Sequence, residues 1–309
     1  MSQISKPATG KKVETLESPA HSGKQSLTEG RSLKTGTMSL ISVATARALQ
    51  SISNQNNEGV VLFNQGNYGE AVQVFKNATN TSKTFLNRPP EQAQSVAASA
   101  ELVMSMLVFP SSQMTRTCEL RSDNDPTVYA NTFEVLVSLV GVVEDSCGHL
   151  TKQRNAVGDG HCLLFSKLAT VLIYNLALAY HAAAMVSRDS DTTTKRVYLS
   201  KARDLYSLAY SIPQGDQEKE IIDAALLPLF VMAILNNLGQ CYAFLDDRNN
   251  SEACFELLLR TIIVFQQNFS GACNLGAFDD LLYNERSMAC FLNNTLFLIL
   301  RNPCVAPAA

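Results

Sequence analysis

Residues 56–78 read Asn-Asn-Glu-Gly-Val-Val-Leu-Phe-Asn-Gln-Gly-Asn-Tyr-Gly-Glu-Ala-Val-Gln-Val-Phe-Lys-Asn-Ala, and this stretch decides the fold. Apolar residues recur at helical spacing on both sides of a Gly-Asn turn signal. Small residues at Gly59 and Ala71 let two antiparallel helices approach closely, while Phe75 and Ala78 are placed to face a next helix pair. The stretch therefore predicts a helical hairpin that stacks on further hairpins.

The start of this stretch recurs along the chain. Asn56-Asn57-Glu58-Gly59 is repeated as Asn236-Asn237-Leu238-Gly239, with looser versions at 174–177 and 292–295. Each copy lies within an apolar pattern of helical spacing, so a repeated helical unit explains the recurrence.

The stretch 59–78 resembles one full tetratricopeptide repeat, with its small residue, aromatic residues, turn glycine and mid-helix alanine in register. Two further units match in part, and Arg260 takes the late alanine position of the third. The positions that the resemblance assigns to packing between helices are Gly59, Gly66, Tyr68, Ala71, Phe75, Ala78, Ala177, Tyr180, Ala202, Tyr206, Ala209, Gly239, Tyr242 and Ala253.

The resemblance implies an all-α superhelix of about three helix pairs with a C-terminal capping helix. We expect a disordered tail over 1–38, a first helix pair over 39–84, an insertion over 85–160, a helical array over 161–302 and a short tail over 303–309. Residues 91–108 of the insertion are interpreted as one helix, and 125–137 as a short strand or extended segment. A loop at 158–160 is expected to open the next helix.

In such arrays the first helices of the pairs line a concave groove, and this implies a protein scaffold that binds a partner peptide or helix there. An asparagine amide in that groove can bond a ligand backbone, or it can bond a neighbouring helix instead. The candidate groove residues are Asn56, Asn64, His181, Asn236, Gln240 and Asn293.

Composition disfavours several other classes. A net charge of -3, without a Lys/Arg stripe and interleaved aromatics, disfavours nucleic acid as partner. The longest uncharged run, 168–187, carries Asn175 and His181, which favour a buried helix over membrane insertion. The N-terminus lacks an apolar signal region, so we expect a cytoplasmic or nuclear protein rather than a secreted one. The eight cysteines form no Cys-x-x-Cys pair, and buried free thiols are expected.

Two alternatives stay open. Asp159-Gly-His-Cys162-Leu resembles the signature of ovarian-tumour-type cysteine proteases, in which Cys162 would be the nucleophile and His181 the one histidine left beyond it. Cys147 and His149, together with His161 and Cys162, have poor spacing for a zinc site. We expect no enzyme, no metal and no cofactor. The apolar stretch 291–300 makes a homo-oligomeric structural protein the second alternative.

Overall fold

The computed structural model describes eight ranges of the chain, and all of them lie within Thr35–Ala309. They are 37–41, 43–86, 101–110, 128–143, 154–187, 192–212, 226–269 and 290–295.

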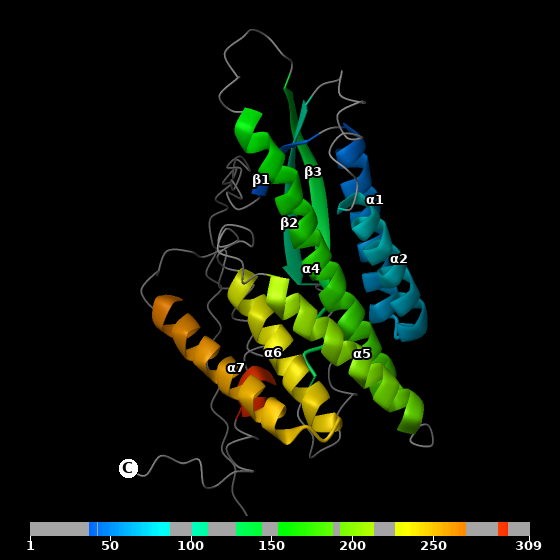
Figure 1. Ribbon diagram of the computed structural model, residues 1–309, viewed down its shortest axis with the longest axis vertical. Coiled ribbons are helices and arrows are strands. Elements are labelled where there is room, and N and C mark those ends of the chain that lie inside the picture. Colours follow the sequence, from blue (N-terminus) through cyan, green and yellow to red (C-terminus); the bar gives the residue numbers. More distant parts are fainter. Residues whose placement is uncertain are drawn as a thin grey trace, which may run out of the picture. The chain divides into compact units, whose positions relative to one another are not determined.

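Helices dominate this part of the chain and stack as three pairs (Figure 1). The first pair is α1 (Val43–Asn64) and α2 (Tyr68–Leu86). The second is α4 (Arg154–Val186) and α5 (Thr192–Ser211), and the third is α6 (Leu226–Phe244) and α7 (Arg248–Phe269). A short helical segment at 290–295 follows. The tetratricopeptide-like helical fold expected from the sequence is confirmed.

The absence of a side chain at one position of the first helix lets the pairs close. A Cβ built on Gly59 would lie 2.5 Å from the Phe75 ring, and one on Gly239 would lie 3.0 Å from the Phe255 ring. In both pairs a phenyl ring of the second helix therefore rests on the backbone of the first. Phe75 and Phe255 are accordingly buried.

The turns of the first and third pairs have the same hydrogen bonds. The Asn67 N–H donates to the Leu62 carbonyl at 3.0 Å, and the Asp247 N–H donates to the Tyr242 carbonyl at 2.9 Å. Gly66 has φ 83°, and Asp246 has φ 65° at the matching place. Aspartate is one of the few residues besides glycine that tolerate this backbone conformation.

Alignment on Gly239 corrects the predicted register of the third pair. Ala253 is exposed, and the small residue that packs against α6 is Ser251, whose hydroxyl donates to the Gly239 carbonyl at 2.8 Å. The late alanine position belongs to the buried Leu258, and Arg260 is exposed. The sequence-based register was wrong because the third pair has a polar serine where the pattern favours alanine.

A three-stranded antiparallel sheet in the order β1-β2-β3 packs against the helices. Its strands are β1 (Thr37–Ile41), β2 (Glu101–Pro110) and β3 (Phe133–Val143). Met38 pairs with Ser105 and Val108 with Val135. The predicted short strand is thus real, but it begins and ends later than expected and belongs to a sheet.

Two expectations of helix are corrected by this sheet. The helix expected to extend to residue 108 is replaced from Glu101 onward by β2. The first helix pair, expected from residue 39, begins only at Val43, after β1. The run Glu101–Pro110 contains Leu and Met, which helices favour, beside Val, which favours strands. Pairing with β1 and β3 on both sides overrides that local preference.

The helix α4 is the centre of the molecule and contacts helices of all three pairs. It already includes 158–160, so the loop expected there is part of the helix. Residues Leu164–Val186 are long and apolar enough to cross a membrane, but 78% of the most apolar window is buried by the rest of the molecule. The burial explains its composition as that of a core helix.

Candidate peptide-binding groove

An extended piece of the chain lies along the first helices of all three pairs. This piece, residues 128–137, is called here the groove segment; it includes the first five residues of β3, and side chains of α1, α4 and α6 are hydrogen-bonded to it. Asparagines equivalent in the repeat provide these bonds. The groove in which the sequence predicts a partner peptide therefore holds part of the protein itself.

The first clamp is formed by Asn57 of α1. Its amide nitrogen donates to the Val135 carbonyl at 2.8 Å, and its amide oxygen accepts from the Val135 N–H at 3.0 Å. The Ser53 hydroxyl donates to the same carbonyl at 2.7 Å. Both backbone groups of Val135 are therefore satisfied on the side that faces α1.

The second clamp is formed by Asn175 of α4. The Phe133 N–H donates to its amide oxygen at 2.9 Å, and its amide nitrogen donates to the Phe133 carbonyl at 2.8 Å. Asn56 of α1 also donates to that carbonyl, at 3.0 Å, and accepts from Asn175 at 2.9 Å. All of these groups are buried, so the first and second pairs share one polar network.

The third clamp is formed by Asn237 of α6. The Tyr129 N–H donates to its amide oxygen, and its amide nitrogen donates to the Tyr129 carbonyl, both at 2.9 Å. Asn236 donates to the Asn237 oxygen at 3.0 Å and accepts from Asn294 at 2.6 Å. The contact between Asn294 and Asn236 repeats, two units further along, the contact between Asn175 and Asn56.

These three clamps share one chemical principle. A primary amide carries a donor and an acceptor side by side, as a peptide group does, so one asparagine can pair with both backbone groups of one residue. The clamped residues are Tyr129, Phe133 and Val135, and the Tyr174 hydroxyl donates to the Asn131 carbonyl between them at 3.2 Å. The arrangement recognises an extended backbone without reading its side chains.

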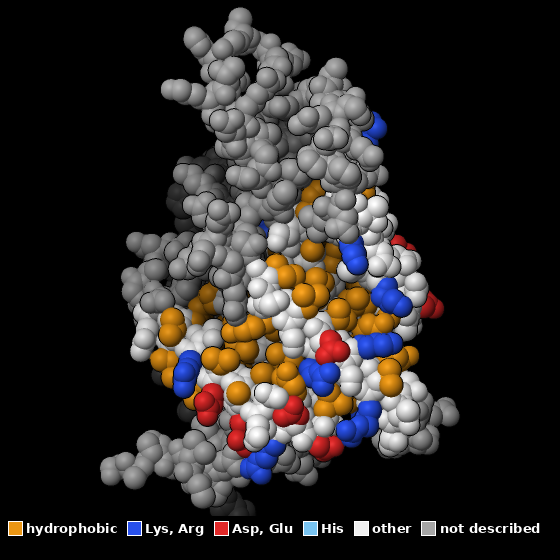
Figure 2. Space-filling model, in the orientation of Figure 1, with side chains coloured by type: hydrophobic (Ala, Val, Ile, Leu, Met, Phe, Trp, Pro, Cys, Tyr) orange, Lys and Arg blue, Asp and Glu red, His pale blue; other side chains and the backbone are white. Residues whose placement is uncertain are grey.

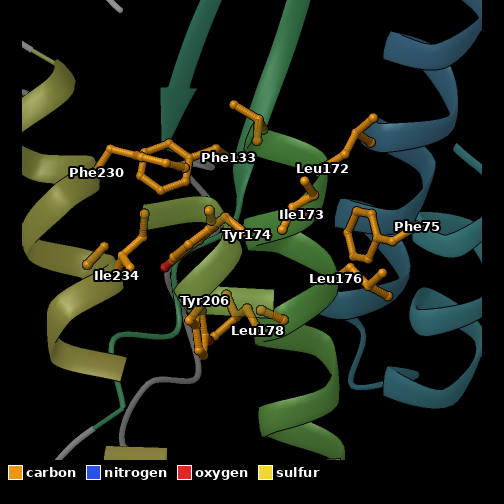
Figure 3. Packing of buried hydrophobic residues seen from close by; sticks show 14 of the residues in the cluster. Phe75, Phe133, Leu172, Ile173, Tyr174, Leu176, Leu178, Tyr206, Phe230 and Ile234 are labelled. Carbon is orange, nitrogen blue, oxygen red and sulfur yellow. The ribbon is translucent and has the colours of Figure 1, made fainter. Parts of the chain in front are cut away.

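Side chains of the groove segment fill the core between the helices. Phe133 is fully buried, with its ring centroid 5.2 Å from that of Tyr174 and 5.1 Å from that of Phe230 (Figure 3). Tyr129 packs on Phe291 of the last helical segment, with 4.9 Å between the centroids. The segment therefore joins α4, α6 and the end of the array through apolar contacts as well.

The predicted groove residues fall in different surroundings. Asn56 donates to the Phe133 carbonyl of the groove segment, and Asn236 bonds the clamp residue Asn237. Asn64 is partly buried at the last position of α1. Asn293 is exposed, and its neighbour Asn294 is the residue that faces Asn236. Which of these two adjacent asparagines faces Asn236 depends on how the short helix is rotated about its axis. Six residues are too few for a sequence pattern to show that rotation, and only the structure gives it.

His181 and Gln240 are interior residues rather than part of an accessible surface, since both are fully buried. The His181 ring packs near Tyr206 and Phe244, and its Nδ1 lies 3.7 Å from the Cys241 sulfur. Burial lowers the pKa of His181 from 6.5 to about 3, so the ring is neutral at physiological pH. Burial also raises the pKa of the Cys241 thiol far above its ordinary value.

Sequence reasoning identified the repeated asparagines but selected the wrong member of some pairs. Asn57, Asn175 and Asn237 make the bidentate clamps. Asn56 connects the first clamp to the second, and Asn236 connects the third clamp to Asn294. The sequence does show that these three asparagines share one repeat position. It does not show that the backbone they bind is that of residues 129–135.

The geometry also bears on the cysteine-protease alternative. Cys162 lies within α4, about two turns after Arg154, so it is outside the first turn where a helix terminus lowers a thiol pKa. His181 follows on the same helix, about 28 Å further along its axis, and is buried. A Cys162–His181 pair is therefore geometrically impossible. Among the described residues, no group of three or more His, Cys, Asp or Glu side chains could hold a metal ion.

Comparison with known proteins supports the repeat assignment at one place. A family model described as tetratricopeptide repeat matches residues 233–261. No curated protein and no solved structure matches the chain. The matched residues run from α6 across the turn at Asp246 into α7, which is the third helix pair. Residues 233–261 are thus similar to a tetratricopeptide repeat, and the first pair has the same turn and the same glycine–phenylalanine contact.

Proposed function

We propose that the chain is a non-catalytic protein-binding scaffold whose groove is occupied by its own groove segment and whose partner binds on the outer surface. Three asparagine clamps on one extended backbone carry this proposal. The clamps bind a peptide backbone in the groove, and the backbone that they bind belongs to the same chain. The similarity of the third helix pair to a repeat common in protein-binding scaffolds supports the general class.

Energetics favour a permanent occupant over an exchangeable one. Tyr129, Phe133 and Val135 are almost entirely buried, and each such side chain contributes about 1.5–3 kcal/mol. The groove segment is also tethered to its site, which gives an effective concentration on the order of millimolar. A free peptide with equal contacts would have to exceed that concentration, so displacement by a partner is unfavourable.

We also propose that the protein acts inside the cell, in the cytoplasm or nucleus. Cys241 and Cys254 are buried as free thiols, and burial raises the pKa of Cys254 to about 12. Thiols of this kind fit a reducing compartment.

The test combines partner capture with hydrogen exchange. The full chain is used to capture a partner from extract of its own cells, and the partner is then purified and bound to the chain in vitro. We expect the amides of Phe133 and Val135 to keep their slow exchange in the complex, while amides on outer helix faces gain protection. Faster exchange of these two amides on binding would show that the partner takes the groove, and the proposal would be wrong. Capture of nothing beyond what the tag alone retains would contradict the scaffold itself.

A further inference from the structure

We propose that a cleft between α2 and α5 is the partner site on the outer surface, and that it takes an acidic amphipathic helix. This inference rests on the proposed scaffold function and names its partner by chemistry. The cleft has a volume of about 330 Å³ and is lined by residues of α2, α4 and α5.

The floor of the cleft is apolar. Leu176 and Tyr180 of α4 and Leu205 of α5 line it. On α4, Leu176 follows the clamp residue Asn175, so the cleft lies about 100° around the helix from the groove segment. The two sites use different faces of α4, and occupation of the groove leaves the cleft open.

One wall of the cleft continues as a stripe along α5. Val197, Lys201, Leu205 and Leu208 follow one another at helical spacing, and Val197 and Leu208 are 45% and 48% exposed. The apolar members Val197, Leu205 and Leu208 extend the floor to about 16 Å, or three helical turns. On the face shown in Figure 2, hydrophobic side chains gather over α4 and α5 with charged side chains between and around them. This length and pattern fit a short amphipathic helix lying in a groove.

The charges at the rim determine which helix fits. Lys76 of α2 and Lys201 of α5 stand on opposite sides of the cleft, and Lys83 follows Lys76 two turns along α2. Within the described part of the chain, no carboxylate forms an ion pair with any of these three lysines. The acidic lining residue, Asp204, is already bonded by Arg203 at 2.8 Å. The Lys201 ammonium lies over the Tyr180 ring, 5.4 Å from its centroid, which leaves its charge uncompensated by any carboxylate of the described residues. The rim is therefore positive and complements an acidic partner.

Burial of apolar side chains supplies most of the affinity, while the lysines select the sign of the partner's charge. Exposed ion pairs contribute only about 0.2–1 kcal/mol each. The chain's own residues 1–38 have six Lys or Arg against three Glu, which is the wrong sign for this cleft. A nucleic acid would match the sign of the rim but not the apolar floor. An acidic helix with leucines on one face satisfies both parts.

The test uses a synthetic amphipathic helix of about 16 residues with Leu on one face and Glu on the other, and calorimetry on the full chain. We expect binding, with heteronuclear NMR shifts at Leu176, Tyr180 and Leu205. The double variant K76E/K201E should bind roughly tenfold more weakly, because two ion pairs become repulsions. The control R248E/R260E makes the same change of net charge on α7 and should bind as the wild type does.

A second peptide, with Lys in place of Glu, sharpens the outcome. It should prefer K76E/K201E over the wild-type chain, since charge exchange restores the complementarity. Three results would contradict the proposed cleft site. They are an equal loss of binding in R248E/R260E, equal binding of both peptides, and no binding of the Glu peptide at millimolar concentration. A natural partner that cross-links to other outer faces would overturn the cleft alone, whereas displacement of the groove segment would overturn the proposed function.

Discussion

At the scale of single residues, the clamp asparagines substitute for a neighbouring strand. A backbone buried between helices has no sheet partner on its helix-facing side, and unpaired N–H and C=O groups there would be costly. Asn57, Asn175 and Asn237 each satisfy one such residue of the groove segment. The stability of the segment therefore depends on three side chains that local sequence patterns treat as ordinary helix residues.

Replacement of Asn175 by Ala tests this role. It leaves the Phe133 N–H and the Asn56 amide oxygen without a partner, while the Phe133 carbonyl keeps its bond from Asn56. Each buried unsatisfied group costs about 1–3 kcal/mol. We expect Asn175→Ala to lower the free energy of unfolding by about 2–5 kcal/mol in urea denaturation, with the same slope. Asn293→Ala, at an exposed asparagine of the same repeat motif, is the control and should change little. Equal effects of the two substitutions would refute the clamp.

His181 predicts a specific dependence of stability on pH. Its folded pKa of about 3 lies below the unfolded value of 6.5, so the unfolded state binds more protons between these values. The contribution of the neutral His181 ring to the free energy of unfolding is complete above pH 6.5. It is lost as the pH falls from 6.5 toward 3, by about 1.4 kcal/mol per pH unit. From pH 7.5 to 5.5, wild type should lose about 1 kcal/mol more stability than His181→Leu. The other three histidines are common to both proteins and cancel, so an identical loss would contradict the neutral buried ring.

At the scale of elements, each helix pair depends on a close approach between its two helices, and the positions of glycine and phenylalanine in the sequence predict that approach. Gly59 and Phe75, and likewise Gly239 and Phe255, bring a ring onto a helix backbone. The turn residues Gly66 and Asp246 then set the angle at which the second helix returns. Because these contacts are local in sequence, periodicity and turn chemistry were sufficient to predict the hairpins.

Alanine substitutions should separate the two glycines. A Cβ on Gly59 would lie 2.5 Å from the Phe75 ring, which forces the helices apart, whereas the nearest atom to a Cβ on Gly239 lies at 3.0 Å. Against a gain of about 0.5–1 kcal/mol in helix propensity, we expect Gly59→Ala to destabilise by about 1–3 kcal/mol and Gly239→Ala by clearly less. Thermal unfolding of both variants measures this. The double variant Gly59→Ala/Phe75→Leu should recover part of the loss, and no recovery would mean that the ring contact is not the cause.

At the scale of the whole molecule, the groove segment joins repeats that would otherwise contact only their neighbours. Stacked repeats are held by nearest-neighbour interfaces and can unfold separately. Here residues 129–135 bond helices of all three pairs. The array is therefore tied together along its length.

We expect this connection to make unfolding cooperative. In native-state hydrogen exchange with increasing denaturant, the slowest amides of α1, α4, α6 and the groove segment should share one free energy of opening. Exchange of α6 and α7 at a lower free energy than α1 and α2 would show independent repeats and would contradict the connecting role. Under Asn175→Ala we expect the shared value to fall for all four elements together.

The strand β2 shows where sequence reasoning failed. Glu101–Pro110 alternates poorly and is rich in residues that also form helices, so its local pattern is ambiguous. Its pairing with β3 spans residues far away in sequence, including Val108 with Val135. Such long-range pairing leaves no period in the sequence, and it outweighs local preference.

The sequence by itself determined the helical hairpins, the turn at Gly66 and the recurrence of asparagines at one repeat position, because each depends on neighbours a few residues apart. The resemblance to a tetratricopeptide repeat left two partners open for these asparagines, a peptide backbone or a neighbouring helix. Only the tertiary structure decided which backbone they hold, since the groove segment reaches Asn57, Asn175 and Asn237 through contacts between residues far apart in the chain. Because the groove segment fills the groove, we expect a partner to bind at the outer helix faces.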